Sequence, residues 1–112
     1  MRSRAVDHGY SGYEGRLSRI VGAGIEAHLG DCLVGLEKEG LRVSPAGTVS
    51  LRPHPAAFGS ALTHPYITTD FSEALLELIT PALKSKSDVL QFLRDLHTFV
   101  YRHLDDELLW ST

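Results

Sequence analysis

The stretch 67–81, ITTDFSEALLELITP, decides the fold of this chain. It opens with β-branched residues and ends on Pro81, and it carries Asp70 and Glu77 inside a largely apolar run. Solvation normally keeps carboxylates out of buried segments, because an unpaired buried charge is costly. Acids that persist in such a run usually meet a cation. The stretch therefore predicts a buried structural element and a candidate metal site in the same place.

Residues 71–80 are compatible with two geometries. A helix would place Asp70, Glu73 and Glu77 on one face. One uninterrupted strand would put Asp70 and Glu77 on opposite faces, because their separation is odd. A break or a bulge near residues 72–74 would return both to one face. The β-branched ending before Pro81 favours strand, bulge, strand, and Glu73 fits solvent better than a ligand role in either geometry.

A second acidic pair lies in the stretch 33–43, LVGLEKEGLRV. Glu37 and Glu39 are two apart on a predicted strand, so both project from the same face. Two like charges at that distance favour a hard divalent cation such as Mg²⁺, which prefers carboxylate oxygen. On spacing alone, a solvated strand face with Lys38 and Arg42 as ion-pair partners is the more ordinary interpretation. For Asp70 and Glu77, a helix with its acids in water remains equally open.

Outside these stretches, local patterns predict the remaining elements. We expect a flexible leader over 1–13 and, from the spacing of apolar residues, a helix from Tyr13 to near Gly30. A strand over 32–43 should be followed by a turn over 44–47 and a return strand over 48–51. Prolines and glycine indicate a loop over 52–65. The clearest element is an amphipathic helix, with Ser85 or Ser87 as its cap and Asp88 in its first turn. Its apolar positions are Val89, Phe92, Leu93, Leu96, Phe99, Val100 and Leu104.

Size and composition limit the function classes. A chain of 112 residues forms one domain at most, and its net charge of −3 gives no reason to expect a nucleic acid or an anionic membrane as partner. Cys32 is the only cysteine, which excludes an internal disulfide and fits a small buried residue. With no signal peptide pattern and no long apolar run, we expect a soluble, cytoplasmic protein.

Other possible sites are weaker. His54-Pro55 and His64-Pro65 repeat a dipeptide, but no third nitrogen or sulfur ligand sits at a recognisable spacing, so structural roles are the better interpretation. Neither common glycine-rich phosphate loop occurs. Any nucleotide must be bound in another way.

Taken together, the segments resemble proteobacterial glutamate–cysteine ligase (γ-glutamylcysteine synthetase). The similarity covers roughly residues 33–110. Its most specific part is the stretch 67–81, and it includes GLEKEGLRV at 35–43, His54-Pro55, GSALTH at 59–64, RDLH at 94–97, Asp106-Glu107 and Trp110.

The resemblance implies a fold, a reaction and a ligand set. The fold is α+β, a partial antiparallel sheet of the glutamine synthetase-like fold with an N-terminal helix and a C-terminal amphipathic helix, over residues 14–112. The reaction joins the γ-carboxylate of glutamate to the amine of cysteine through an acyl phosphate. ATP is the co-substrate, and Mg²⁺, which Mn²⁺ can replace, is the cofactor. The metal ligands correspond to Glu37, Glu39, Asp70 and Glu77, which reverses the ordinary interpretation of both acid pairs.

Two departures accompany the resemblance. Gly40 stands where the family more often has a polar residue such as threonine. Members of the family are also several times longer, so we expect this chain to be an N-terminal portion that lacks further ligands and substrate-binding arginines. The alternative is a non-catalytic remnant or interaction module, which would self-associate or assemble with a complementary chain that carries the rest of the sheet.

Overall fold

The computed structural model describes residues 10–110, which divide into two units after Cys32. In the first unit, α1 (Tyr10–Gly22) is followed by the 3-10 helix η1 (Ile25–Asp31). The helix predicted from Tyr13 to near Gly30 is therefore interrupted, because Gly24 adopts a left-handed conformation with φ of 66°. Residues 10–13 of the predicted leader belong to α1, and residues 1–9 lie outside the described part. Cys32 is exposed, so its predicted burial is wrong.

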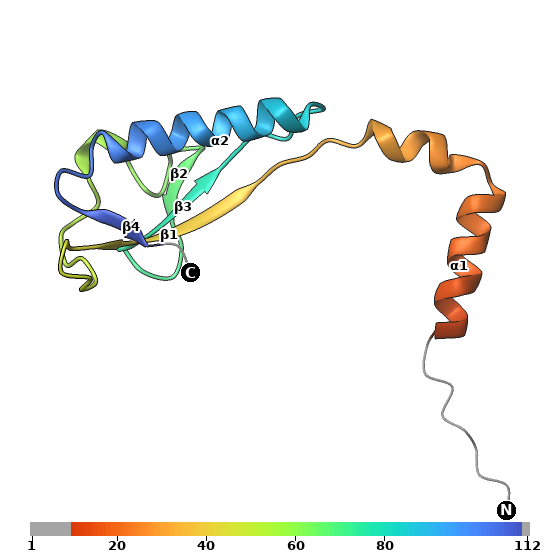
Figure 1. Cartoon of the computed structure of the whole chain (residues 1–112), viewed down its shortest axis with the longest axis horizontal. Helices are drawn as coiled ribbons and strands as arrows, with labels where there is room; N and C mark the ends of the chain where they lie inside the picture. Colours follow the sequence, from red (N-terminus) through yellow and green to blue (C-terminus); the bar gives the residue numbers. More distant parts are fainter. Residues whose placement is uncertain (1–9, 111–112) are drawn as a thin grey trace, which may run out of the picture. The chain divides into compact units, whose positions relative to one another are not determined.

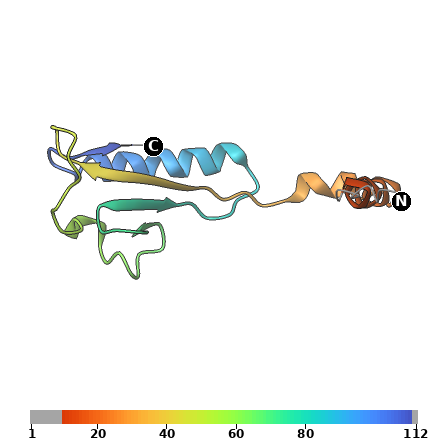
Figure 2. The same ribbon diagram turned by 90° about the horizontal axis from the view of Figure 1, so that it is seen from below.

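The second unit is built on a four-stranded antiparallel sheet in the order β2-β3-β1-β4. Figures 1 and 2 show β1 and β3 running side by side. The strands are β1 (Glu37–Val43), β2 (Ile67–Thr69), β3 (Leu75–Ile79) and β4 (Leu108–Trp110). A short 3-10 turn, η2 (Ala56–Phe58), lies in the predicted loop.

The helix α2 (Lys86–Tyr101) lies along one face of this sheet (Figure 1). The side chain of Ser85 accepts a hydrogen bond from the amide of Asp88 at 3.2 Å, which confirms the predicted cap. The core forms between α2 and the sheet, because the apolar stripe of the helix covers alternate strand residues. Its buried members are Phe58, Ile67, Leu76, Leu78, Val100 and Leu104.

The α+β fold class is confirmed, but three local predictions need correction. The predicted strand over 32–43 begins only at Glu37. The predicted strand over 48–51 is reduced to one bridge between Val43 and Val49. Residues 70–74 form a reversing turn, which is the break that the sequence allowed and not the favoured bulge, so β2 and β3 make a hairpin. The strand β4 was not predicted, because three residues are too few for a periodic signal.

The turn after β1 is as predicted. The amide of Gly47 donates to the carbonyl of Ser44 at 2.9 Å, and Gly47 has a positive φ of 80°. Within residues 10–110, every helix is too short or too polar to cross a membrane.

Candidate functional site: an acidic sheet face

The two faces of the sheet differ in cover and in chemistry. Alternation along β1 places Lys38, Gly40 and Arg42 on the face beneath α2, whereas Glu37 and Glu39 project from the other face. The same alternation in β3 buries Leu76 and Leu78 and turns Glu77 to the second face. We call this second face, which α2 does not cover, the acidic face.

The strand register brings the predicted acids together on the acidic face. Glu39 lies directly opposite Glu77 in the β1–β3 ladder, and Glu37 is one step along the same face, opposite Ile79. On the other side of β3, Thr68 pairs with Glu77. The amide of Asp70 donates to the carbonyl of Leu75 at 3.2 Å, which continues that pairing and puts Asp70 on the same face. All four predicted residues therefore share one surface.

Electrostatics agree with this placement. The pKa of Glu77 is raised above its ordinary value, first by partial burial and then by the negative charges of Glu37, Asp70 and Glu39. Neighbouring like charges disfavour the ionised carboxylate. Glu77 is thus the acid whose pKa is raised by burial and by the negative charges of the other three.

Neither of the cations proposed as ion-pair partners on spacing grounds neutralises this face. Arg42 points to the opposite side of the sheet, where it pairs with Glu107. Lys38 also lies on the α2 side, where burial and then the charge of Lys38 lower the pKa of His97. Among the residues that the structure describes, the four acids form no ion pair with lysine or arginine. The predicted ion pairing with Lys38 and Arg42 is therefore not found, whereas Glu37 and Glu39 are exposed to solvent.

The four carboxylates share a face, but their side chains are not arranged around a common point as metal ligands would be. In residues 10–110, no three histidine, cysteine or acidic side chains converge tightly enough to hold a metal ion. Glu37, Glu39 and Asp70 are exposed, so their side chains are free to rotate toward a cation. Their donor set consists entirely of carboxylate oxygen, which suits a hard cation such as Mg²⁺.

The two His-Pro histidines have structural surroundings. The Nδ1 atom of His64 accepts hydrogen bonds from the amides of Tyr66 and Ile67 at 3.1 and 2.9 Å, so it caps the start of β2. The ring of His54 packs edge-on against Phe58, and its nitrogens are buried without partners. Burial and the charge of Arg42 lower the pKa of His54. The hydrogen bonds of His64 agree with the structural interpretation, which stays a prediction for His54.

Sequence patterns missed the network behind the acidic face. Arg42 is fully buried and donates to Glu107, to the carbonyl of Arg52 at 2.9 Å and to the carbonyl of Glu73 at 3.2 Å. Ser50 donates to the same Glu107 carboxylate. The only sequence signal for this network was an arginine at an inward position of β1, which must find partners when buried.

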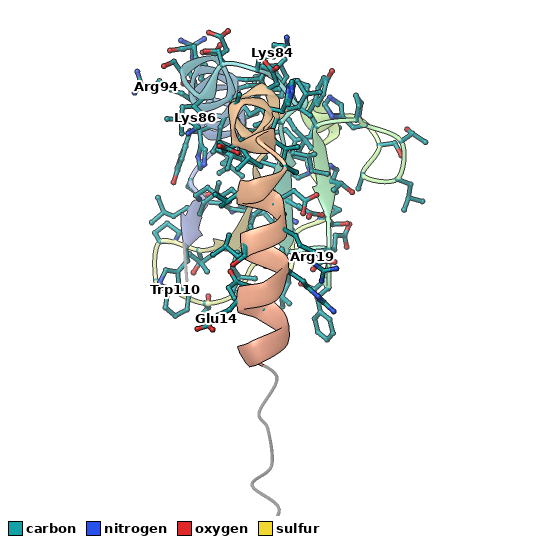
Figure 3. All side chains as sticks on the ribbon, turned by 90° about the vertical axis from the view of Figure 1, so that its right-hand side faces the viewer. Glu14, Arg19, Lys84, Lys86, Arg94 and Trp110 are labelled. Carbon is teal, nitrogen blue, oxygen red and sulfur yellow. The ribbon has the colours of Figure 1, made fainter. Side chains whose placement is uncertain are left out.

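An apolar pocket lies at the β4 end of the sheet. It has a volume of about 350 Å³ and is lined by residues that include Val43, Pro45, Leu108 and Trp110. In Figure 3 the side chain of Trp110 projects away from α2. By register, Trp110 pairs with Leu41 and Leu108 pairs with Val43, so the pocket opens on the same side of the sheet as the acids.

Comparison with known proteins identifies the family of this chain. A family model described as glutamate-cysteine ligase matches residues 17–112. The glutamate–cysteine ligase of Alcanivorax borkumensis is 50% identical over 97 residues, which cover 87% of this chain and 18% of that protein. The enzyme of the same name from Azotobacter vinelandii is 59% identical over 80 residues, which cover 71% of this chain and 15% of that protein.

Solved structures give the same result. A crystal structure of Francisella tularensis glutamate–cysteine ligase in complex with AMP matches with a TM-score of 0.67 and 40% identity, over 69% of this chain and 16% of that one. A bifunctional glutathione synthetase from Pasteurella multocida matches with a TM-score of 0.71 and 41% identity, over 81% of this chain and 13% of that one. The chain spans less than a fifth of the length of each of these relatives.

Proposed function

Because this chain belongs to the glutamate–cysteine ligase family, we propose that it provides the acidic sheet segment of a ligase that joins glutamate to cysteine. In this reaction ATP phosphorylates the γ-carboxylate of glutamate, and the cysteine amine displaces the phosphate. The product is γ-glutamylcysteine, the first intermediate of glutathione synthesis. The observation that carries the proposal is the placement of Glu37, Glu39, Asp70 and Glu77 on one face in a chain of this family.

The proposed role of the four acids is to hold Mg²⁺ beside the phosphates of ATP. The bound ion would neutralise phosphate charge that develops during transfer. Burial and then the neighbouring negative charges raise the pKa of Glu77, and binding of the ion would offset the effect of those charges. Glu39 and Glu77, which lie directly opposite each other, are the best placed to share one cation, with Glu37 and Asp70 beside them.

We propose that the remainder of the site comes from polypeptide that this chain does not contain. The support is the length of the relatives, since the chain covers 18% and 15% of the two glutamate–cysteine ligases compared above. Acids alone bind a cation, but phosphoryl transfer also needs groups that hold ATP and the amino acids in line. We therefore expect the isolated chain to bind a divalent metal ion but not to catalyse the ligase reaction.

A second candidate role is assembly with a complementary chain or with another copy of this one. It is favoured by the outer edge of β4, which pairs with no strand in the described residues, and by the exposed side chains of Leu108 and Trp110 around the apolar pocket. Unpaired strand edges are ready templates for strand addition. Sedimentation velocity across a concentration series tests this role, and a monomer at all concentrations would reject self-association.

The experiment that tests the metal role is calorimetric titration of the 112-residue chain with Mn²⁺. We expect Glu39→Gln and Glu77→Gln to weaken binding, because each removes a carboxylate from the acidic face. Glu26→Gln is the matched control, since Glu26 lies in the separate first unit. Unchanged affinity in both acidic-face variants would reject the proposed ligands.

Release of ADP in the presence of ATP, Mg²⁺, glutamate and cysteine then tests whether the chain is sufficient for the reaction. Turnover that requires both amino acids and disappears in Glu39→Gln would mean that these residues suffice as a ligase. A folded chain that binds Mn²⁺ but releases no ADP would agree with a shared site.

A further inference from the structure

Residues outside the β2–β3 hairpin form hydrogen bonds to the turn that carries Asp70. Within the hairpin, the amide of Leu75 donates to the carbonyl of Ser72 at 3.0 Å and the amide of Asp70 donates to the carbonyl of Leu75 at 3.2 Å. Arg42 adds two bonds from β1. Its amide donates to the carbonyl of Ala74 at 2.8 Å, and its guanidinium donates to the carbonyl of Glu73 at 3.2 Å.

The side chain of Glu73 makes a second attachment. Its carboxylate accepts a hydrogen bond from the backbone amide of His54 at 2.8 Å. The loop that contains His54 is itself held, because the carbonyl of Arg52 accepts from the same Arg42 guanidinium at 2.9 Å. The side chain of Glu73 therefore links the β2–β3 turn to a loop 19 positions earlier in the chain.

Arg42, which donates several of these hydrogen bonds, is held in place by burial and by an ion pair. Arg42 has no exposed surface and is paired with the buried Glu107. The turn, by contrast, is solvent-exposed, and the side chain of Phe71 at its tip is 93% exposed. An exposed turn with few packing contacts fluctuates unless hydrogen bonds tie it to a rigid element. Here the rigid element is Arg42, which binds the backbone carbonyl of Glu73, and the Glu73 side chain adds a bond to the His54 loop that Arg42 also holds.

We propose that Glu73 is a positioning residue that holds Asp70 in place beside Glu77 on the acidic face. The inference rests on the proposed role of these acids as metal ligands. In this arrangement Glu73 touches no metal and contributes as a hydrogen-bond acceptor, not as a negative charge. Groups that orient metal ligands typically change affinity by about 10- to 100-fold when removed.

The test compares Glu73→Ala with Glu73→Gln, because glutamine keeps an oxygen that accepts the His54 amide but loses the charge. Two quantities are measured on the whole chain: the Mn²⁺ affinity by calorimetry, and hydrogen exchange at the amides of Asp70 and Leu75 without metal. We expect Glu73→Ala to weaken Mn²⁺ binding by about 10-fold and to accelerate both amides. We expect Glu73→Gln to behave like the unmodified chain in both measurements.

Each other outcome overturns part of the interpretation. If Glu73→Ala leaves affinity and exchange unchanged, Glu73 does not position the turn. If Glu73→Gln weakens Mn²⁺ as much as alanine does, Glu73 acts through its charge and the positioning role is rejected. If the unmodified chain binds no Mn²⁺, the metal proposal fails, and the exchange of Asp70 and Leu75 still decides whether Glu73 holds the turn.

Discussion

Arg42 and Glu107, 65 positions apart in the chain, form a buried ion pair with 3.0 Å between Nη1 and Oε2. Arg42 stands on the α2 side of β1, and Glu107 directly precedes β4. The pair therefore joins the centre of the sheet to its last strand. It also explains why an arginine next to two glutamates does not neutralise them, since alternation along the strand sends it to the other face.

Removing one partner of this pair should destabilise the fold strongly. We expect Glu107→Leu to lower the free energy of unfolding by about 3–5 kcal/mol, because it leaves the Arg42 guanidinium buried without its counter-charge. Urea unfolding followed by circular dichroism measures the loss. The exposed pair of Arg52 and Asp106, 2.6 Å apart, is the matched control. Asp106→Ala should barely move the midpoint, and an equal loss in the two variants would contradict the assigned importance of burial.

The raised pKa of Glu77 predicts a pH-dependent stability in the absence of metal. A carboxyl whose pKa is higher in the folded state favours folding in its protonated form. Its contribution is fully present below the ordinary value of 4.5 and is lost as the pH rises through the folded value. We expect Glu77→Gln to raise the thermal midpoint at pH 7 and to flatten its pH dependence, whereas Glu26→Gln should do neither. A lower midpoint for Glu77→Gln at pH 7 would reject the repulsion.

Gly40 should accept a side chain. It lies in extended strand β1, and a Cβ atom there would meet Leu109 at 3.5 Å, an ordinary van der Waals contact. We expect Gly40→Ala to stabilise the chain by about 0.5–1 kcal/mol, because alanine loses less backbone entropy on folding. Gly47→Ala is the contrasting variant. Its φ of 80° should make it destabilising by about 1–2 kcal/mol in the same urea titration. Destabilisation by Gly40→Ala would mean that β1 and β4 pack more tightly than the contact indicates.

The cap of α2 should be specific to one of two serines. Ser85→Ala removes the oxygen that accepts from the Asp88 amide, and we expect it to cost about 1 kcal/mol. Ser87→Ala lies inside the helix and should cost nothing, since alanine is the better helix former. Urea unfolding of both variants checks the difference. Equal effects would argue against Ser85 as the cap.

Local patterns predicted those parts of the fold that local forces decide. The apolar repeat from Val89 to Leu104 is long enough to identify α2, and a serine before it supplies the cap. The turn at Gly47 was also predictable, because few residues adopt its conformation. The single helix predicted across Gly22 and Gly24 failed for the same reason, since two glycines allow the chain to break between α1 and η1.

Cross-strand relationships could not be predicted in this way. Residues 70–74 had no pattern that separates a bulge from a reversing turn, because the difference lies in which strand pairs with which. β4 is only three residues long, and it forms because β1 offers it an edge and Glu107 binds Arg42. Neither cause is visible in a short window of sequence.

The sequence by itself determined the helix α2 and the turn at Gly47, because apolar periodicity and turn chemistry are properties of a single segment. Its resemblance over residues 33–110 indicated the family and the four acids. The tertiary structure decided that Glu39 lies opposite Glu77, that Asp70 joins them from a turn and that Arg42 faces away. These facts depend on strand register, which forms between segments more than 30 positions apart and is selected by burial of one whole face beneath α2.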